Sequence, residues 1–194
     1  LKYDMEKGEG PELAKKFGVR AYPTFVIVNP DGTIRHKLVG GGEGEKFIER
    51  VKESFDDNKA LGVLDAKYNN GDRDKAFLAQ YAQVMVANYD PNAKAIVDEL
   101  LKISTDEEKL SEDYWFIFGN SELSPKDSEA AKFLTDNRSK FNETIGKEKV
   151  DNRLSEGLFR EILMVIAGRG QKTDVKRLDA IGREVKALKL SNEK

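Results

Sequence analysis

The sequence predicts an α/β segment over residues 1–57, with the order strand, helix, hairpin and helix. An all-α domain of helical hairpins is expected to follow over residues 58–194. Three observations predict this division. A β-branched hairpin pattern occurs only in the first part. The second part has only two prolines, both where a helix plausibly begins, and its apolar residues recur at helical spacing.

The hairpin is the strongest local pattern. Thr-Phe-Val-Ile-Val at 24–28 is a β-branched and aromatic run typical of a buried strand. The turn at 29–32 is Asn-Pro-Asp-Gly, in which proline restricts φ and glycine supplies a positive φ. Residues 33–39 then alternate and form the second strand. His36 lies on this strand, where we expect a half-exposed structural residue and neither a metal ligand nor a catalytic base.

Shorter sequence patterns predict the strand and the helices around the hairpin. Residues 1–5 are predicted to form a strand. Pro11 stands at a likely first helical position, and Gly18 closes that helix. Three glycines at 40–42 end the hairpin, and apolar residues at helical spacing predict a helix over 43–55.

This order, with Tyr22-Pro23-Thr24 opening the hairpin and Val-Gly-Gly closing it, resembles the C-terminal half of the thioredoxin fold over residues 1–57. The resemblance implies that the Tyr22–Pro23 peptide bond is cis and that the backbone of Tyr22 pairs with an extended substrate segment. It also implies that a strand-end glycine lets the substrate backbone approach closely. The substrate-binding residues implied in this way are Tyr22, Pro23, Thr24, Gly40 and Gly41.

The chain departs from this family in one decisive respect. It contains no cysteine, so the Cys-x-x-Cys motif of thioredoxin-like enzymes is absent. We therefore expect no catalytic residue here, no metal or organic cofactor, and no catalysis by this chain alone. Together with the leucine at position 1, the absent half of the fold predicts that the chain is a fragment.

The fold order creates a second expectation. In the thioredoxin fold, a strand of the absent half lies between the strands expected at 1–5 and 24–28. Unpaired strand edges are costly when buried and adhesive when exposed. We expect the gap to be filled by the missing N-terminal half, by a second copy of the chain, or by direct pairing of these two strands.

For function, the resemblance implies a parent thiol–disulfide oxidoreductase that acts on protein disulfides, with a protein or peptide substrate in the Tyr22–Pro23 groove. The alternative is a redox-inactive module, in which a thioredoxin-like platform and a helical array bind a polypeptide without a covalent step. A Cys-x-x-Cys motif preceding this sequence in the parent would distinguish the first from the second.

The second part of the chain is predicted to be helical throughout. Asp90 and Ser124, each followed by a proline, are the expected N-caps. The paired helices resemble tetratricopeptide repeats, although the fixed 34-residue spacing of that class is absent. The aromatic cluster at 114–118 is expected to be helix core. The predicted helices cover residues 60–69, 72–89, 92–103, 111–119, 126–142, 147–167 and 173–190.

The break at 69–72, followed by Phe77, Leu78 and Tyr81, resembles the helical extensions of some bacterial thioredoxin-like proteins. This resemblance implies a bacterial protein of the periplasm or cell envelope. Composition excludes other classes. With a net charge of −2 and interspersed charges, no basic stripe indicates nucleic-acid binding. The longest apolar runs are too short to form a membrane span.

Overall fold

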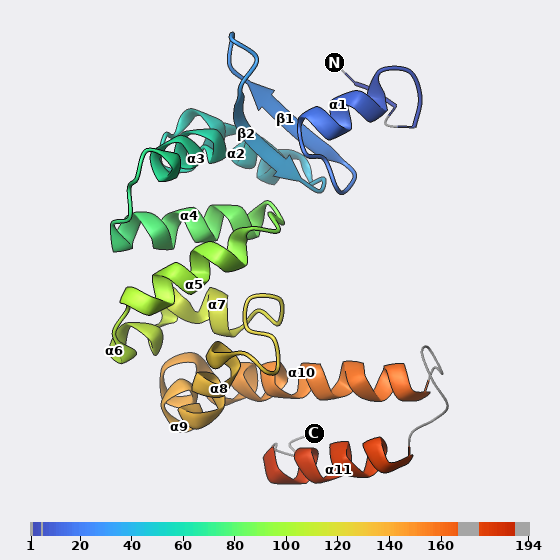
Figure 1. Cartoon of the computed structure of the whole chain (residues 1–194), viewed down its shortest axis with the longest axis vertical. Helices are drawn as coiled ribbons and strands as arrows, with labels where there is room; N and C mark the ends of the chain where they lie inside the picture. Colours follow the sequence, from blue (N-terminus) through green and yellow to red (C-terminus); the bar gives the residue numbers. More distant parts are fainter. Residues whose placement is uncertain (1, 5, 167–174, 189–194) are drawn as a thin grey trace. The chain divides into compact units, whose positions relative to one another are not determined.

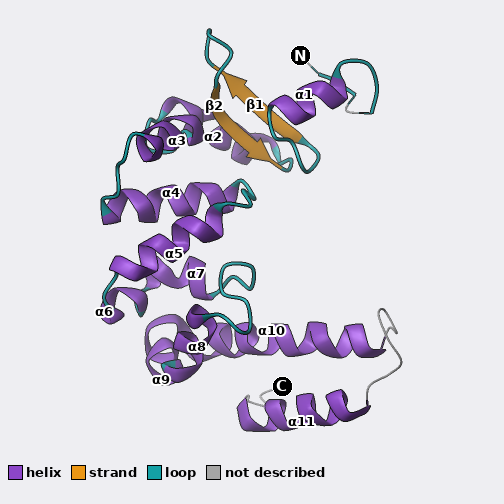
Figure 2. Ribbon diagram, in the orientation of Figure 1, coloured by secondary structure: helices purple, strands orange, loops and turns teal. Residues whose placement is uncertain are grey.

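The computed structural model describes residues 2–4, 6–166 and 175–188. These residues are mostly helical and contain one two-stranded antiparallel sheet (Figure 2). The expectation of an α/β part followed by a helical part is thus met at this coarse level. The chain divides into two compact units, Leu1–Ile103 (unit 1) and Ser104–Lys194 (unit 2), whereas the sequence predicts a boundary after residue 57.

The hairpin forms as predicted. Strand β1 (Thr24–Val28) pairs with β2 (Ile34–Val39), with Thr24 opposite Val39 and Ile27 opposite His36. The turn closes because the Asn29 N–H donates to the Thr33 carbonyl at 2.9 Å and Gly32 adopts a φ of 83°. A register shift between Ile27 and Val28 marks an irregularity at this end of the ladder.

Two helices flank the hairpin in sequence. Helix α1 (Gly10–Lys16) ends before Gly18, which has a φ of 59°. Helix α2 (Gly44–Lys52) continues into a 3₁₀ turn, η1 (Glu53–Phe55), so the helix predicted over 43–55 is confirmed. Figure 1 shows both helices beside the two strands.

The strand predicted at residues 1–5 is wrong for residues 2–4, while residues 1 and 5 lie outside the described residues. Asp4 instead begins a turn that leads toward α1. Its carboxylate accepts the Glu6 N–H at 3.0 Å, its carbonyl accepts the Lys7 N–H, and Gly8 follows with a φ of 57°. Because residues 2–4 form no strand, they do not pair with β1, which removes one of the three expected ways of completing the sheet.

Helix α3 (Leu61–Asn69) packs directly on β2. A Cβ placed on Gly62 would lie only 1.9 Å from the Ile34 carbonyl oxygen, so the helix and strand backbones are in contact. Leu61, Leu64 and Leu38 are buried at this junction. The first helix of the predicted helical domain therefore shares a core with the hairpin, which explains why the compact unit extends past residue 57.

Helices α4 (Lys75–Ala87) and α5 (Ala93–Ile103) pack against each other and complete unit 1. Asp74 caps α4, because its carboxylate accepts the N–H groups of Ala76 and Phe77. The predicted cap Asp90 accepts the Asn92 N–H at 2.9 Å, immediately before α5 begins.

Unit 2 is a helical cluster around buried aromatic side chains. Phe118 and Phe141 have ring centroids 5.1 Å apart and are almost fully buried, so the prediction of a core role for residues 114–118 is confirmed. Its elements are α6 (Asp106–Lys109), η2 (Glu112–Tyr114), α7 (Trp115–Phe118), α8 (Glu129–Asp136), α9 (Arg138–Phe141), the π-helical η3 (Asn142–Gly146), α10 (Lys147–Ile166) and α11 (Val175–Leu188).

Two expectations for unit 2 are wrong. Ser124 is not an N-cap, because it is fully buried and its carbonyl accepts a hydrogen bond from Arg153. Ser128 caps α8 instead, accepting the Ala131 N–H. The helix expected to end at Asn142 continues, because the π-helical segment joins α9 to α10. No helix among the described residues is long and apolar enough to cross a membrane.

The contact at Gly62 can be tested by substitution. We expect Gly62→Ala to destabilise unit 1 by about 1–3 kcal/mol, because the added methyl group meets the β2 backbone. The control is Gly182→Ala on α11, where a Cβ has no neighbour within 4 Å. The control should leave unit 1 unchanged. Urea unfolding followed by NMR peak intensities separates the units, and equal unit 1 midpoints in wild type and Gly62→Ala would contradict the contact.

Candidate functional site

The five residues predicted to bind a substrate come together where the hairpin opens. The Gly40 N–H donates to the Pro23 carbonyl at 2.8 Å, and Thr24 lies opposite Val39 in the ladder. A Cβ placed on Gly41 would lie 4.0 Å from Pro23 Cγ. We refer to Tyr22, Pro23, Thr24, Gly40 and Gly41 as the Pro23 corner.

Local interactions shape this corner. The Tyr22–Pro23 peptide bond is cis, in agreement with the expectation from the resemblance. The Thr24 hydroxyl donates to the Ala21 carbonyl at 2.6 Å and closes a short turn around the proline. Gly40 has a φ of 81°, a conformation that glycine adopts without steric cost. The corner is thus built from one proline, one hydroxyl and one left-handed glycine.

Tyr22 remains accessible in this arrangement. Its side chain is exposed, at 66% of the full accessible area. Its backbone N–H and C=O make no hydrogen bond to any residue in the described part of the chain. The Tyr22 peptide groups are therefore available to a ligand.

Backbone groups that face away from β2 also lie along β1. Pro23 and Gly40 form a hydrogen-bonded pair, and such pairs alternate with non-hydrogen-bonded pairs along an antiparallel ladder. Phe25 therefore directs its backbone groups at β2, whereas Thr24 and Val26 direct theirs away from it. We call the backbone N–H and C=O groups of Thr24 and Val26 the outer edge of β1. Among described residues, this edge has no paired strand.

The corresponding end of β2 is occupied by Arg50, which the sequence analysis missed. This α2 side chain donates to the Val39 carbonyl at 2.8 Å and to the Gly41 carbonyl at 3.2 Å. The available signal was weak, because an arginine on a helix face normally indicates solvent exposure. Arg50 thus donates hydrogen bonds to outward-facing carbonyl groups at this end of β2. The two edges of the sheet therefore differ in whether their carbonyl groups have a donor from α2.

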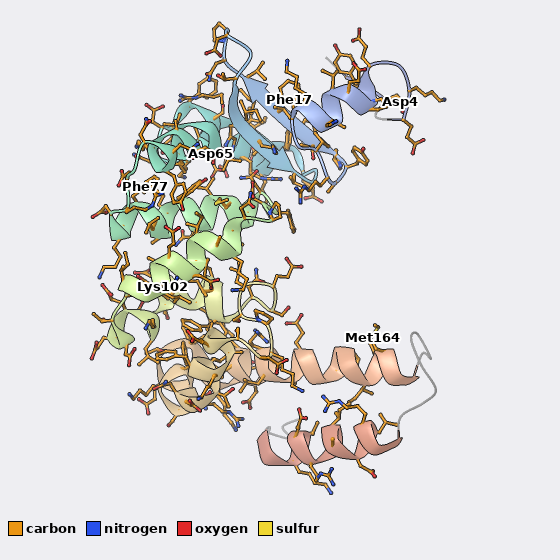
Figure 3. All side chains as sticks on the ribbon, viewed as in Figure 1. Asp4, Phe17, Asp65, Phe77, Lys102 and Met164 are labelled. Carbon is orange, nitrogen blue, oxygen red and sulfur yellow. The ribbon has the colours of Figure 1, made fainter. Side chains whose placement is uncertain are left out.

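The surroundings of the outer edge are apolar. The Phe25 ring lies 4.7 Å from the Phe47 ring of α2 and is still 40% exposed, and Val28 is 47% exposed. Phe17, which follows α1 and is labelled in Figure 3, is half-buried. No charged side chain occurs between Ala21 and Asn29. In space, however, Lys37 lies opposite Val26, and its Nζ would lie 3.7 Å from a Cβ placed on Gly18. The site therefore offers backbone hydrogen bonds and apolar contact, with one cation beside them.

A second polar pair joins α3 to α4. The Tyr81 hydroxyl donates to Asp65 Oδ1 at 2.7 Å, and Figure 3 labels Asp65 above α4. Burial raises the pKa of the Asp65 carboxyl, and burial together with Asp65 raises the pKa of Tyr81. Each group satisfies the other, so we interpret the pair as a structural link between the helices.

His36 is buried, at 1% exposure, so the expectation of a half-exposed side chain is wrong. Its Nδ1 accepts the Leu61 N–H at 3.1 Å and thereby satisfies one of the unpaired donors at the start of α3. Nε2 must then carry the proton, and it has no partner among the described residues. The only histidine of the chain is thus a remote helix cap.

Burial lowers the pKa of His36, with Glu53 opposing this effect and Arg50 and Arg35 adding to it. The unfolded chain therefore binds a proton before the folded chain does. The stability that uncharged His36 contributes is complete above its ordinary pKa of 6.5. It is lost as the pH falls from 6.5 toward the lower pKa that His36 has in the folded protein.

We therefore expect unit 1 to become less stable as the pH falls from about 6.5 to about 5. His36→Gln should lose less stability over this range, because a glutamine oxygen still accepts the Leu61 N–H but does not titrate. Urea midpoints at several pH values provide the measurement. Asp65, whose raised pKa acts in the opposite sense, is common to both proteins and cancels in the difference. Parallel curves would contradict the role assigned to His36.

The described ranges contain no group of three or more histidine, aspartate or glutamate side chains that could hold a metal ion. In comparisons with known proteins, no family model, no curated protein and no solved structure matches the chain.

Proposed function

We propose that these residues form the polypeptide-binding part of a thioredoxin-like thiol–disulfide oxidoreductase that acts on protein disulfides. The observation that carries the proposal is the Pro23 corner, where Pro23 lies beside Gly40 and Gly41 and the preceding Tyr22 is exposed. An extended polypeptide needs both features. It needs unpaired N–H and C=O groups to bind, and glycines that leave room for its backbone.

The binding step follows from the geometry. A segment approaching Tyr22 can accept its N–H and donate to its carbonyl, as one strand does for another. Gly40 and Gly41 place no side chain beside Pro23, so the segment can approach closely. These contacts involve only backbone groups and are therefore compatible with many substrate sequences. An enzyme that acts on the disulfides of many different proteins requires this.

The chemical step needs thiols that this chain does not have. Thiol–disulfide exchange begins with the attack of a thiolate on a disulfide sulfur. In the proposed parent, cysteines outside residues 1–194 supply that thiolate, and the missing N-terminal half of the domain, or a second copy of the chain, completes the sheet. The proposed reaction uses no metal ion and no organic cofactor.

The alternative function is a redox-inactive module that binds polypeptides on the same surface. The absence of cysteine from all 194 residues favours this candidate. Both functions use the Pro23 corner in the same way, and they differ only in whether a dithiol faces it in the parent protein.

We expect the chain to bind an unfolded polypeptide at the Pro23 corner. Titration of the ¹⁵N-labelled chain with reduced, carboxymethylated α-lactalbumin should shift the amide signals of Tyr22, Thr24 and Gly41. Gly41→Leu should weaken binding about tenfold, because its side chain occupies the space beside Pro23.

The matched control is Gly182→Leu on α11, which should bind as wild type. The fold of each variant is checked from its amide spectrum. Equal affinities for wild type and Gly41→Leu, or shifts confined to unit 2, would remove the Pro23 corner as the binding site.

We also expect the chain alone to show no turnover in an insulin-reduction assay with dithiothreitol, because it has no thiol. A Cys-x-x-Cys oxidoreductase serves as the positive control. Turnover above the rate with dithiothreitol alone would mean that another group performs the exchange.

A further inference from the structure

We infer that Tyr89 is a further contact residue for the bound polypeptide, and that an apolar or aromatic side chain of the segment held at the Pro23 corner packs on its ring. This inference rests on the proposed function and adds a second point of contact to it. Tyr89 lies in the turn between α4 and α5, outside the sheet. The contact makes no use of the outer edge of β1, which remains for the strand that completes the sheet in the proposed parent.

Tyr89 has a backbone conformation that tyrosine rarely adopts. Its φ is 52°, and it is the only residue other than glycine with a positive φ in the described part of the chain. It occupies the left-handed position that ends α4, because its N–H donates to the Val86 carbonyl at 3.0 Å and the Asp90 N–H donates to the Met85 carbonyl at 2.9 Å. Glycine or asparagine is usual at this position, since a larger side chain is strained there.

Packing of the ring does not offset this strain, because the Tyr89 side chain is 74% exposed. The preceding residue adds a second cost. Asn88 is 7% exposed, and its Oδ1 has no hydrogen-bond partner among the described residues, although its Nδ2 donates to the Val84 carbonyl at 2.9 Å. One turn thus combines a strained residue with a buried unpaired acceptor, and both lower its stability. Departures of this kind from local rules are expected at functional sites.

The exposed ring indicates what the turn does. A tyrosine side chain offers a large apolar surface with only two rotatable bonds, so it loses little conformational entropy when a partner packs on it. Tyrosine is accordingly enriched among the residues that contribute most to binding between polypeptides. The short turn between two packed helices holds the backbone of Tyr89 in place, which leaves the ring ready to bind.

The turn lies on the same side of unit 1 as the Pro23 corner. Figure 1 shows it below the end of the sheet at which β1 begins and β2 ends. Electrostatic interactions agree with this placement. Burial raises the pKa of the Asp65 carboxyl, Asp90 raises it further, and Lys37 of β2 opposes them. Asp90, which follows Tyr89, and Lys37 of the hairpin are therefore both near Asp65.

One extended segment is long enough to reach both places. A unit of about 100 residues has a radius of gyration of about 13 Å. Each residue of an extended segment spans about 3.3 Å, so ten residues cover about 33 Å, more than twice that radius. A segment that pairs with the backbone of Tyr22 can therefore place a later side chain on Tyr89.

Substitution of Tyr89 separates binding from stability. Tyr89→Gly should raise the urea midpoint of unit 1, because glycine adopts this φ without strain. The same variant should bind reduced, carboxymethylated α-lactalbumin at least about fivefold more weakly, whereas Tyr89→Phe keeps the ring and should stay within about twofold of wild type. The matched control is Phe55→Ala, which removes a side chain that is 81% exposed elsewhere in unit 1 and should bind as wild type.

Three outcomes of these measurements would overturn the inference. They are equal affinities for wild type and Tyr89→Gly, an equal loss of affinity in Phe55→Ala, and a lower urea midpoint in Tyr89→Gly. The first would show that the ring is not a contact, the second that any exposed aromatic side chain contributes, and the third that Tyr89 stabilises its own turn.

An NMR titration tests whether one segment touches both places. Carboxymethylated α-lactalbumin should shift the amide signals of Tyr22 and Tyr89, and Gly41→Leu should weaken both sets of shifts together. Tyr89 shifts that keep the wild-type affinity in Gly41→Leu would overturn the inference, because separate segments would then bind. Shifts at Tyr22 without shifts at Tyr89 would overturn it while leaving the proposed function intact. If no signal of unit 1 shifts, the proposed function itself fails.

Discussion

The contact between α3 and β2 is the constraint on which unit 1 depends. A two-stranded hairpin is marginal in water unless another element covers one face. Here α3 provides that cover at the closest distance the backbone allows, because Gly62 has no side chain above Ile34. His36 adds a hydrogen bond to the first turn of the same helix. The hairpin and the first helix after it are therefore one structural unit.

This constraint also makes the two edges of the sheet unequal. Helix α3 packs against β2, Arg50 donates a hydrogen bond to the Val39 carbonyl, and β2 carries the charged side chains of Arg35 and Lys37. Strand β1 carries no charged side chain, and no strand in the described part of the chain pairs with its other edge. The unpaired backbone and the apolar side chains consequently coincide on the same strand, and the Pro23 corner lies at its beginning. The proposed binding function is the consequence of this asymmetry.

Patterns that depend on neighbouring residues could be predicted well. The turn at 29–32 and the helix end at Gly18 follow from local φ preferences, and the resemblance to the thioredoxin fold led us to expect Tyr22 and Pro23 beside Gly40. Patterns that depend on partners distant in sequence could not be predicted. Residues 2–4 belong to the strand predicted at 1–5 but lead into the turn formed by the hydrogen bonds of Asp4. Ser124 precedes a proline but is held in the core by Arg153.

The sequence by itself determined the hairpin, its turn, most of the helices and the absence of a thiol, because propensity, periodicity and composition act within short distances. Only the tertiary structure decided that His36 caps a helix, that Arg50 closes β2 and that Gly62 touches a strand. Each of these contacts joins residues from different elements. Their geometry depends on how the elements pack, which no local pattern in the chain encodes.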